Sequence, residues 1–131
     1  MSASNSITMV GNLVADPILR YTSTGKAVTN ARVAVNDRIN VGGQWQDKTT
    51  FINVVVWGQQ AENFAGSVGK GTRVQFTGRL ETREYTPEGG NPATDRQFFT
   101  EVNVQEIAVS CKFAMVNAVA INAETPAPAA V

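Results

Sequence analysis

The sequence predicts an all-β domain of five strands, with one short helix between the third and the fourth strand. Apolar and polar residues alternate over five separate segments, and a period of two is typical of half-buried strands. Clusters of Gly, Pro, Asn and Asp separate these segments, and one stretch between the third and the fourth has the composition of a helix. The strand spacing is compatible with a small Greek-key barrel and also with a small sandwich.

The first strand is expected over about residues 6–14 and the second over about residues 27–36. Alternate positions of the second strand are apolar, which places Val33 inward and Arg32 outward. A hairpin tip is expected over residues 38–48, because two adjacent glycines in its middle permit a tight reversal of the chain.

The third strand, residues 49–57, carries large aromatic side chains on the face that a half-exposed sheet usually makes polar. Val54 and Val56 lie on one face and are sufficient for a core contact, whereas Phe51 and Trp57 lie on the other. Aromatic rings beside arginines on an open sheet suit unpaired nucleotides, because rings stack on bases and guanidinium groups meet phosphates.

A helix is expected over residues 59–64 and should stop at Gly66. The fourth strand is expected over residues 72–85, and its face from Arg73 to Tyr85 is polar and largely basic. Gly78 inside this strand predicts a bulge or a tight bend, which barrels need in order to curl. A bulge in this strand would invert the assignment of faces beyond Gly78.

The last strand is expected over residues 97–110, after a loop rich in Gly, Pro and Asn. The domain is therefore expected to cover residues 1–110, followed by a C-terminal extension, residues 111–131, with an Ala/Pro-rich end. Within the extension, residues 112–121 are apolar. They are interpreted either as an added strand that pairs with a neighbouring subunit or as a partly disordered segment.

Composition argues for one domain with a real core and against catalysis. The chain has 131 residues, of which 43% are hydrophobic, and it contains no histidine and a single cysteine. Histidine is the commonest general base and metal ligand, and no catalytic or phosphate-loop motif is present, so we expect no enzyme, no metal and no cofactor. Cys111, at the end of an apolar strand pattern, is interpreted as a structural thiol.

The sequence contains no apolar run of the ~20 residues that a membrane helix needs. The N-terminal residues lack the basic and apolar regions of a secretory signal. We therefore expect a cytoplasmic protein without a membrane partner.

The formal net charge of +0 is unusual for a nucleic-acid binder, whose affinity depends on neutralising phosphates. The charges are, however, unevenly distributed. Basic residues outnumber acidic ones between Arg20 and Arg83, and acidic residues dominate after Arg83. This asymmetry fits a basic surface on a neutral molecule, and it fits an ordinary mixed-charge surface equally well.

Several separated motifs occur in a recognisable order along the chain. They are three strand segments and three dipeptides that connect them: residues 7–14, 50–58 and 78–85, with Asp16-Pro17, Arg20-Tyr21 and Lys70-Gly71. Through these motifs the chain resembles bacterial single-stranded DNA-binding proteins from about Ser6 to Val109.

The resemblance implies an oligonucleotide-binding (OB) barrel, and together with the helix position it decides against the sandwich. It further implies a nucleoid-associated homo-oligomer, expected to be a tetramer, that binds and protects single-stranded DNA during replication, recombination or repair. An RNA-binding or protein-docking module is the alternative, because related barrels bind those partners.

By motif, the resemblance assigns base stacking to Phe51 and Trp57, and Tyr85 matches a third aromatic position. Packing in the core or at a subunit interface is the alternative for these rings. Trp45 in the hairpin tip is expected either to wrap DNA or to pin the hairpin to a neighbouring surface. The expected phosphate contacts, which otherwise serve only solubility, are the basic side chains Arg32, Arg38, Lys48, Arg73, Arg79 and Arg83.

Two features depart from the family pattern. A further stacking tryptophan expected near the end of the second strand is replaced by residues 36–38, Asn-Asp-Arg. Family members that serve replication usually end in an acidic tail that recruits partner enzymes, whereas Glu124 is the only side-chain carboxylate in residues 123–131. Recruitment through such a tail is therefore not expected, whether the chain naturally lacks the tail or the sequence is cut short.

Overall fold

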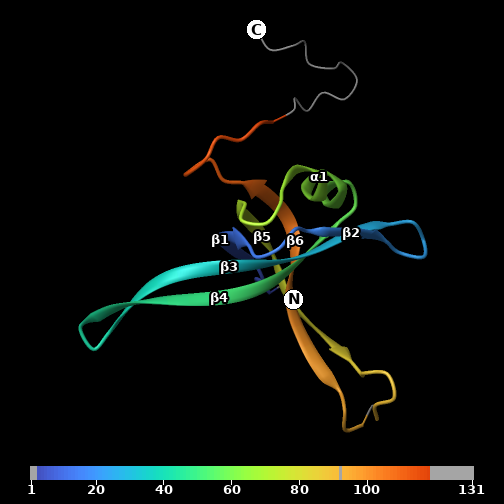
Figure 1. Cartoon of the computed structure of the whole chain (residues 1–131). Helices are drawn as coiled ribbons and strands as arrows, with labels where there is room; N and C mark the ends of the chain where they lie inside the picture. Colours follow the sequence, from blue (N-terminus) through green and yellow to red (C-terminus); the bar gives the residue numbers. More distant parts are fainter. Residues whose placement is uncertain (1–2, 92, 119–131) are drawn as a thin grey trace, which may run out of the picture.

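The computed structural model describes residues 3–91 and 93–118, which form a barrel with one short helix and two projecting hairpin arms (Figure 1). The helix is too short and too polar to cross a membrane. In chain order the elements are β1 (Ile7–Leu13), β2 (Ile18–Tyr21), β3 (Ala27–Val41), β4 (Gln44–Trp57), α1 (Gln59–Ser67), β5 (Arg73–Tyr85) and β6 (Gln97–Val109).

Five of the strands close into a barrel. The sheet order is β1-β5-β6-β4-β3-β2, and an additional pairing of β1 with β3 at Leu13↔Val33 completes the ring. β4 and β6 pair in parallel at Val54↔Val102, whereas the other pairings are antiparallel. The predicted five-stranded OB barrel is confirmed, with α1 between its third and fourth strands in chain order, β4 and β5.

β2 lies outside the ring and was missed by the sequence analysis. Its four residues are all exposed and show no apolar alternation, so the periodic signal of a half-buried strand is absent. β2 pairs with the beginning of β3, from Ile18↔Asn30 to Tyr21↔Ala27. The Tyr21 hydroxyl donates a hydrogen bond of 3.3 Å to Glu62 of α1, and this carboxylate raises the pKa of Tyr21 above its usual 10.0.

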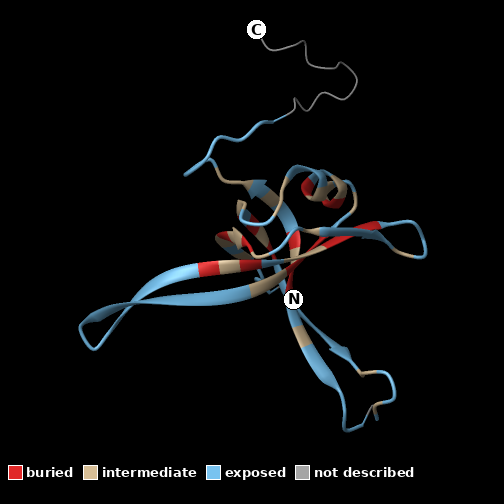
Figure 2. Ribbon diagram, in the orientation of Figure 1, coloured by how far each residue is buried: buried red, intermediate tan, exposed pale blue. Residues whose placement is uncertain are grey.

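The hydrophobic core lies where the strands cross, as the buried segments in Figure 2 show. Phe76, Val33, Val54 and Val56 are fully buried there, and each such side chain stabilises the fold by roughly 1.5–3 kcal/mol relative to an exposed one. α1 contributes its buried Phe64 to the same core. The predicted inward positions of β3 and β4 are therefore confirmed.

Two long hairpins extend from this core as exposed arms (Figures 1 and 2). Pairing of β3 with β4 continues to Val41↔Gln44, so the chain reverses only at Gly42 and Gly43, both with positive φ. The predicted tip of residues 38–48 was too long. Alternation of polar and apolar residues marks a strand only where one face is buried, and both faces of this arm are exposed.

A register shift between β5 and β6 lies at Gly78, but the extra residue belongs to β6. Thr77 pairs with Glu106 and Gly78 pairs with Val104, which leaves Gln105 unpaired. β5 therefore keeps its alternation, and the faces beyond Gly78 do not invert. Glycine is required because a Cβ at this position would clash with the carbonyl oxygen of Asn103.

Gln60 of α1 replaces the hydrogen bonds that the bulge removes from β6. Its amide nitrogen donates to the carbonyl oxygen of Gln105 at 3.2 Å, and its amide oxygen accepts from the backbone nitrogen of Ile107 at 2.9 Å. The helix is thus connected to the sheet at the point where β6 is irregular.

After β6 the chain continues without regular secondary structure through residues 111–118. Cys111 is exposed, so its interpretation as a structural thiol was wrong: the apolar alternation ends at Val109, before the cysteine. Residues 112–118 form no strand within the chain, and residues 119–121 lie outside the described residues. Pairing of this segment with a neighbouring subunit stays a prediction.

We expect Gln60→Ala to lower the free energy of unfolding by about 1–2 kcal/mol, because two backbone groups at the bulge lose their partner. Urea denaturation followed by circular dichroism measures this. Gln59→Ala is the matched control, since Gln59 bonds only to Asn63 of its own helix within the described residues and should change stability by less than about 0.5 kcal/mol. Equal losses in the two variants would contradict a role of Gln60 at the bulge.

Candidate nucleic-acid interface

The outer face of β4 presents two aromatic rings to solvent. Phe51 is 50% exposed and Trp57 is 37% exposed, while Val54 and Val56 between them point into the core. Across the β3–β4 ladder, Phe51 lies opposite Ala34, which is too small to cover the ring. The two rings share one face because a strand alternates its side chains, and they are available for stacking.

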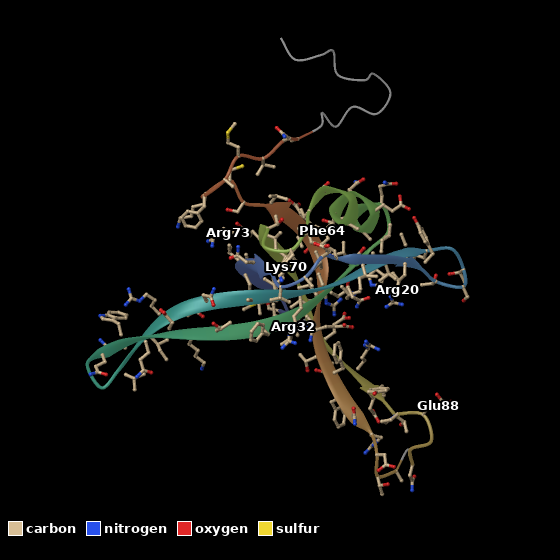
Figure 3. All side chains as sticks on the ribbon, viewed as in Figure 1. Arg20, Arg32, Phe64, Lys70, Arg73 and Glu88 are labelled. Atoms are coloured by element: carbon tan, nitrogen blue, oxygen red, sulfur yellow. The ribbon has the colours of Figure 1, made fainter. Side chains whose placement is uncertain are left out.

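A cationic side chain lies over each of these rings. The Lys26 ammonium lies 4.9 Å from the centroid of the Trp57 ring, and the Arg32 guanidinium lies 4.6 Å from that of Phe51. An exposed cation–π contact contributes about 0.5–1 kcal/mol, whereas a stacked base contributes about 1–3 kcal/mol. A base can therefore displace the cation, which is then free to contact a phosphate. Figure 3 shows Arg32 at the root of the β3–β4 arm.

Trp45 lies far from this pair, near the tip of the β3–β4 arm. It is 63% exposed and is separated from Trp57 by twelve residues of β4, or about 40 Å at ~3.3 Å per residue. The Arg38 guanidinium lies 5.9 Å from the ring, and Arg38 Nε also lies 3.6 Å from an Asp47 carboxylate oxygen. Lys48, also exposed, lies on the same arm opposite Asp37.

The β5–β6 arm carries the third predicted ring and two predicted cations. Tyr85, at the end of β5, is 49% exposed, and Arg83 and Arg79 precede it at alternate positions of the same face. Arg79 is exposed and forms no ion pair or ring contact within the described residues. This arm and the β3–β4 arm diverge from the barrel in different directions (Figure 1).

Arg73 is not brought together with the other predicted cations. It begins β5, ten residues and about 33 Å along the strand from Arg83. Its guanidinium lies 5.1 Å from the centroid of Phe113. Its Nε is buried and has no hydrogen-bond partner in the described part of the chain. Figure 3 places Arg73 and Lys70 near β1, on the other side of β3 and β4 from Arg32. The polar face of β5 therefore spans two regions of the molecule.

Sequence reasoning missed several side chains of the interface. Lys26 contacts the Trp57 ring, and Arg20 Nη2 donates to Asn30 Oδ1 at 2.8 Å beside it on the outer face. Phe99 lies under the Arg83 guanidinium, 4.9 Å from ring centroid to Cζ. The signal for Phe99 was present, because it alternates with Glu101 on the outward face of β6.

Comparisons with known proteins agree with this geometry. The profile of the Single-strand binding protein family matches residues 4–110. This chain belongs to that family. The resemblance of the motifs is thereby confirmed, and membership of a family of DNA-binding proteins supports the expectation that the chain is not an enzyme.

Three relatives, each called Single-stranded DNA-binding protein, are about equally similar to the chain. The protein of Paenarthrobacter nicotinovorans is 40% identical over 117 residues, covering 87% of this chain and 66% of the relative. That of Mycobacterium leprae is 42% identical over 117 residues, covering 87% and 67%. That of Corynebacterium glutamicum is 44% identical over 112 residues, covering 83% and 48%. The match therefore spans from about half to about two thirds of the relatives' length.

We expect Asp47→Asn to change the free energy of unfolding by less than about 0.5 kcal/mol, because its ion pair with Arg38 is exposed on both sides. Asp37→Asn on the facing strand is the control, since Asp37 forms no ion pair within the described residues. Urea denaturation compares the two variants. A loss of more than about 1 kcal/mol in Asp47→Asn alone would show that the pair stabilises the arm.

Proposed function

We propose that the protein binds and protects single-stranded DNA without sequence preference during replication, recombination or repair. The observation that carries the proposal is the pair of exposed rings on β4, Phe51 and Trp57, each overlain by a cation and backed by the barrel core. A stacking face combined with displaceable cations suits every base, because every base has a π-face and a phosphate. The names of the relatives point to the same ligand.

The stacking set of the proposal is Phe51, Trp57, Tyr85 and Trp45. Phe51 and Trp57 lie on the barrel face, whereas Trp45 and Tyr85 lie on the two arms. A bound strand that contacts all four rings would therefore follow an extended path. The phosphate set consists of exposed or half-exposed cations: Arg32, Arg38, Lys48, Arg79 and Arg83 along that path, together with Arg73, which lies apart from it. Arg73 is the weakest member, because it lies at the far end of β5.

We also propose that the protein acts as a homo-oligomer, a tetramer by resemblance, in the cytoplasm at the nucleoid. Support comes from β1, which pairs with β5 from Ile7 to Asn12 but with β3 only at Asn12 and Leu13 within the described residues. The other edge of residues 7–10 is therefore available to a second copy of the chain. Sedimentation equilibrium measures the mass, and a monomer at micromolar concentration would overturn this part of the proposal.

We expect Trp57→Ala to weaken binding of a long oligo-dT strand by roughly five- to a hundredfold, the value of one stacked base per subunit. The measurement is a fluorescence-anisotropy titration with labelled strand. Val116→Ala is a control, because Val116 lies outside the barrel and both arms. A folded Trp57→Ala protein with full affinity would remove Trp57 from the stacking set.

Binding should weaken steeply with salt, because each neutralised phosphate releases condensed cations, with a slope of about −0.7 per phosphate on a logarithmic plot for single strands. Quenching of tryptophan fluorescence in Trp45→Phe protein reports on Trp57 alone during such titrations. Equal affinity in dilute and in molar salt would contradict the proposal. Tighter binding of RNA than of DNA of equal length would favour the RNA-binding alternative.

A further inference from the structure

Arg83 is held between two neighbours on the outer face of the β5–β6 arm. Its guanidinium lies 4.9 Å from the centroid of the Phe99 ring, and Phe99 is its direct partner across the ladder. Its Nε donates to Glu101 Oε1 at 3.2 Å. Glu101 lies two residues beyond Phe99 on the same face of β6, so the ring and the carboxylate fix the guanidinium from two sides.

Glu101 is an unexpected residue at this place. Its side chain is only 11% exposed, and its Oε2 atom is buried without a hydrogen-bond partner in the described part of the chain. It also lies directly opposite Glu81 on β5, and like charges in this position repel. A surface that attracts phosphates gains nothing from this carboxylate, so its interaction with Arg83 requires a different explanation.

The pair makes Arg83 a poor phosphate contact. The charge of Glu101 cancels that of Arg83, which lowers the attraction for an anion. If Arg83 moved to a phosphate, the largely buried Glu101 carboxylate would lose its cation while it still faced Glu81, and a buried charge without a partner is destabilising.

The geometry leaves one surface of Arg83 available. The guanidinium lies over the Phe99 ring, while the side chain as a whole is 60% exposed and leaves the side away from the ring open to solvent. Guanidinium planes stack on unpaired bases as aromatic rings do. Tyr85 follows two residues later on the same face, about 7 Å along the strand.

The Arg83–Phe99 pair extends the stacking face of β4 onto the β5–β6 arm. Val55 of β4 pairs with Asn103 of β6, and Phe51 and Phe99 each lie four residues before that pair. Both rings therefore lie on the arm side of the parallel β4–β6 pairing, beyond which the two arms diverge. A strand that ran from Phe51 onto the β5–β6 arm would pass Arg83 before Tyr85, because Tyr85 lies two residues farther out along β5.

We propose that Arg83, supported by Phe99 and fixed by Glu101, is a stacking platform for a base and not a contact to a phosphate. Glu101 is then a positioning residue for this platform. The inference rests on the proposed binding of single-stranded DNA and changes the role of one residue within it.

The test compares affinities for oligo-dT and for an abasic deoxyribose-phosphate strand of equal length, both by anisotropy. Their ratio isolates what the bases contribute. We expect Arg83→Ala and Glu101→Gln each to lower this ratio roughly five- to tenfold, the lower range for one lost stacking platform. The salt slope of abasic binding should not change in Arg83→Ala.

Two control variants change the net charge by the same amounts as the two test variants. Arg79→Ala removes a cation that has no ion-pair partner within the described residues from the same strand face. It should therefore weaken binding of both strands alike and lower the salt slope by about 0.7 per contacting subunit. Glu81→Gln removes the carboxylate opposite Glu101, so it should tighten binding of both the dT strand and the abasic strand alike. Both controls should leave the dT-to-abasic ratio unchanged.

If Arg83 contacts a phosphate, the Glu101→Gln substitution should raise the affinity for both strands instead of lowering the dT-to-abasic ratio. Glu101→Gln would then release Arg83 and tighten both strands as Glu81→Gln does, and Arg83→Ala would weaken both alike with a lower slope. That result overturns the inference. Should Arg83→Ala fail to fold, the double variant Arg83→Ala with Glu101→Gln removes the unpaired charge and is measured in its place.

Failure of the proposed function gives a different result. A wild-type protein that binds neither strand, or that binds dT no better than the abasic strand, would reject single-strand stacking altogether. A wild-type preference for dT that persists in Arg83→Ala and Glu101→Gln would reject only the platform at Arg83.

Discussion

The alternation of side chains along β4 is the constraint on which the binding face depends. Val54 and Val56 are buried in the barrel core, and this burial forces Phe51 and Trp57 to the outside. A slip of one residue would bury the rings and expose the valines. The ladder between β3 and β4, which runs unbroken from Val28↔Trp57 to Val41↔Gln44, prevents such a slip.

The barrel provides stability and the arms provide reach. All buried hydrophobic side chains of the described residues belong to the barrel strands near their crossing or to α1, and the outer ends of β3, β4, β5 and β6 are largely exposed on both faces. The arms therefore contribute little to the free energy of folding. Segments of this kind are drawn from the low-stability end of a structure, which suits surfaces that adapt to a flexible strand.

Charge pairing explains how a neutral molecule can present a binding face. Arg32 and Lys26 lie on exposed rings without an acidic partner among the described residues, whereas Arg83 is neutralised by Glu101 and Arg96 by Glu84. Formal net charge does not distinguish these two groups. The cations that a base can displace onto a phosphate are those without a carboxylate partner, and they are fewer than the sequence count of eleven suggests.

Local alternation and turn residues were sufficient to predict the barrel strands, the helix between the third and fourth of them, and the outward direction of Phe51, Trp57 and Tyr85. The sequence did not reveal β2, which lacks alternation since no face of it is buried. Nor did it assign the bulge to Gln105, because Gly78 on the facing strand carries the visible signal while the extra residue is set by pairing. The contacts of Phe99 and Glu101 with Arg83 were visible only in the tertiary structure, since they depend on the register in which β5 and β6 pair across the intervening loop. The structure also showed that β5 runs from the barrel into an arm, which places Arg73 and Arg83 in different regions. Side-chain period is a local property of the sequence, whereas the partner of a charge depends on which strands lie side by side.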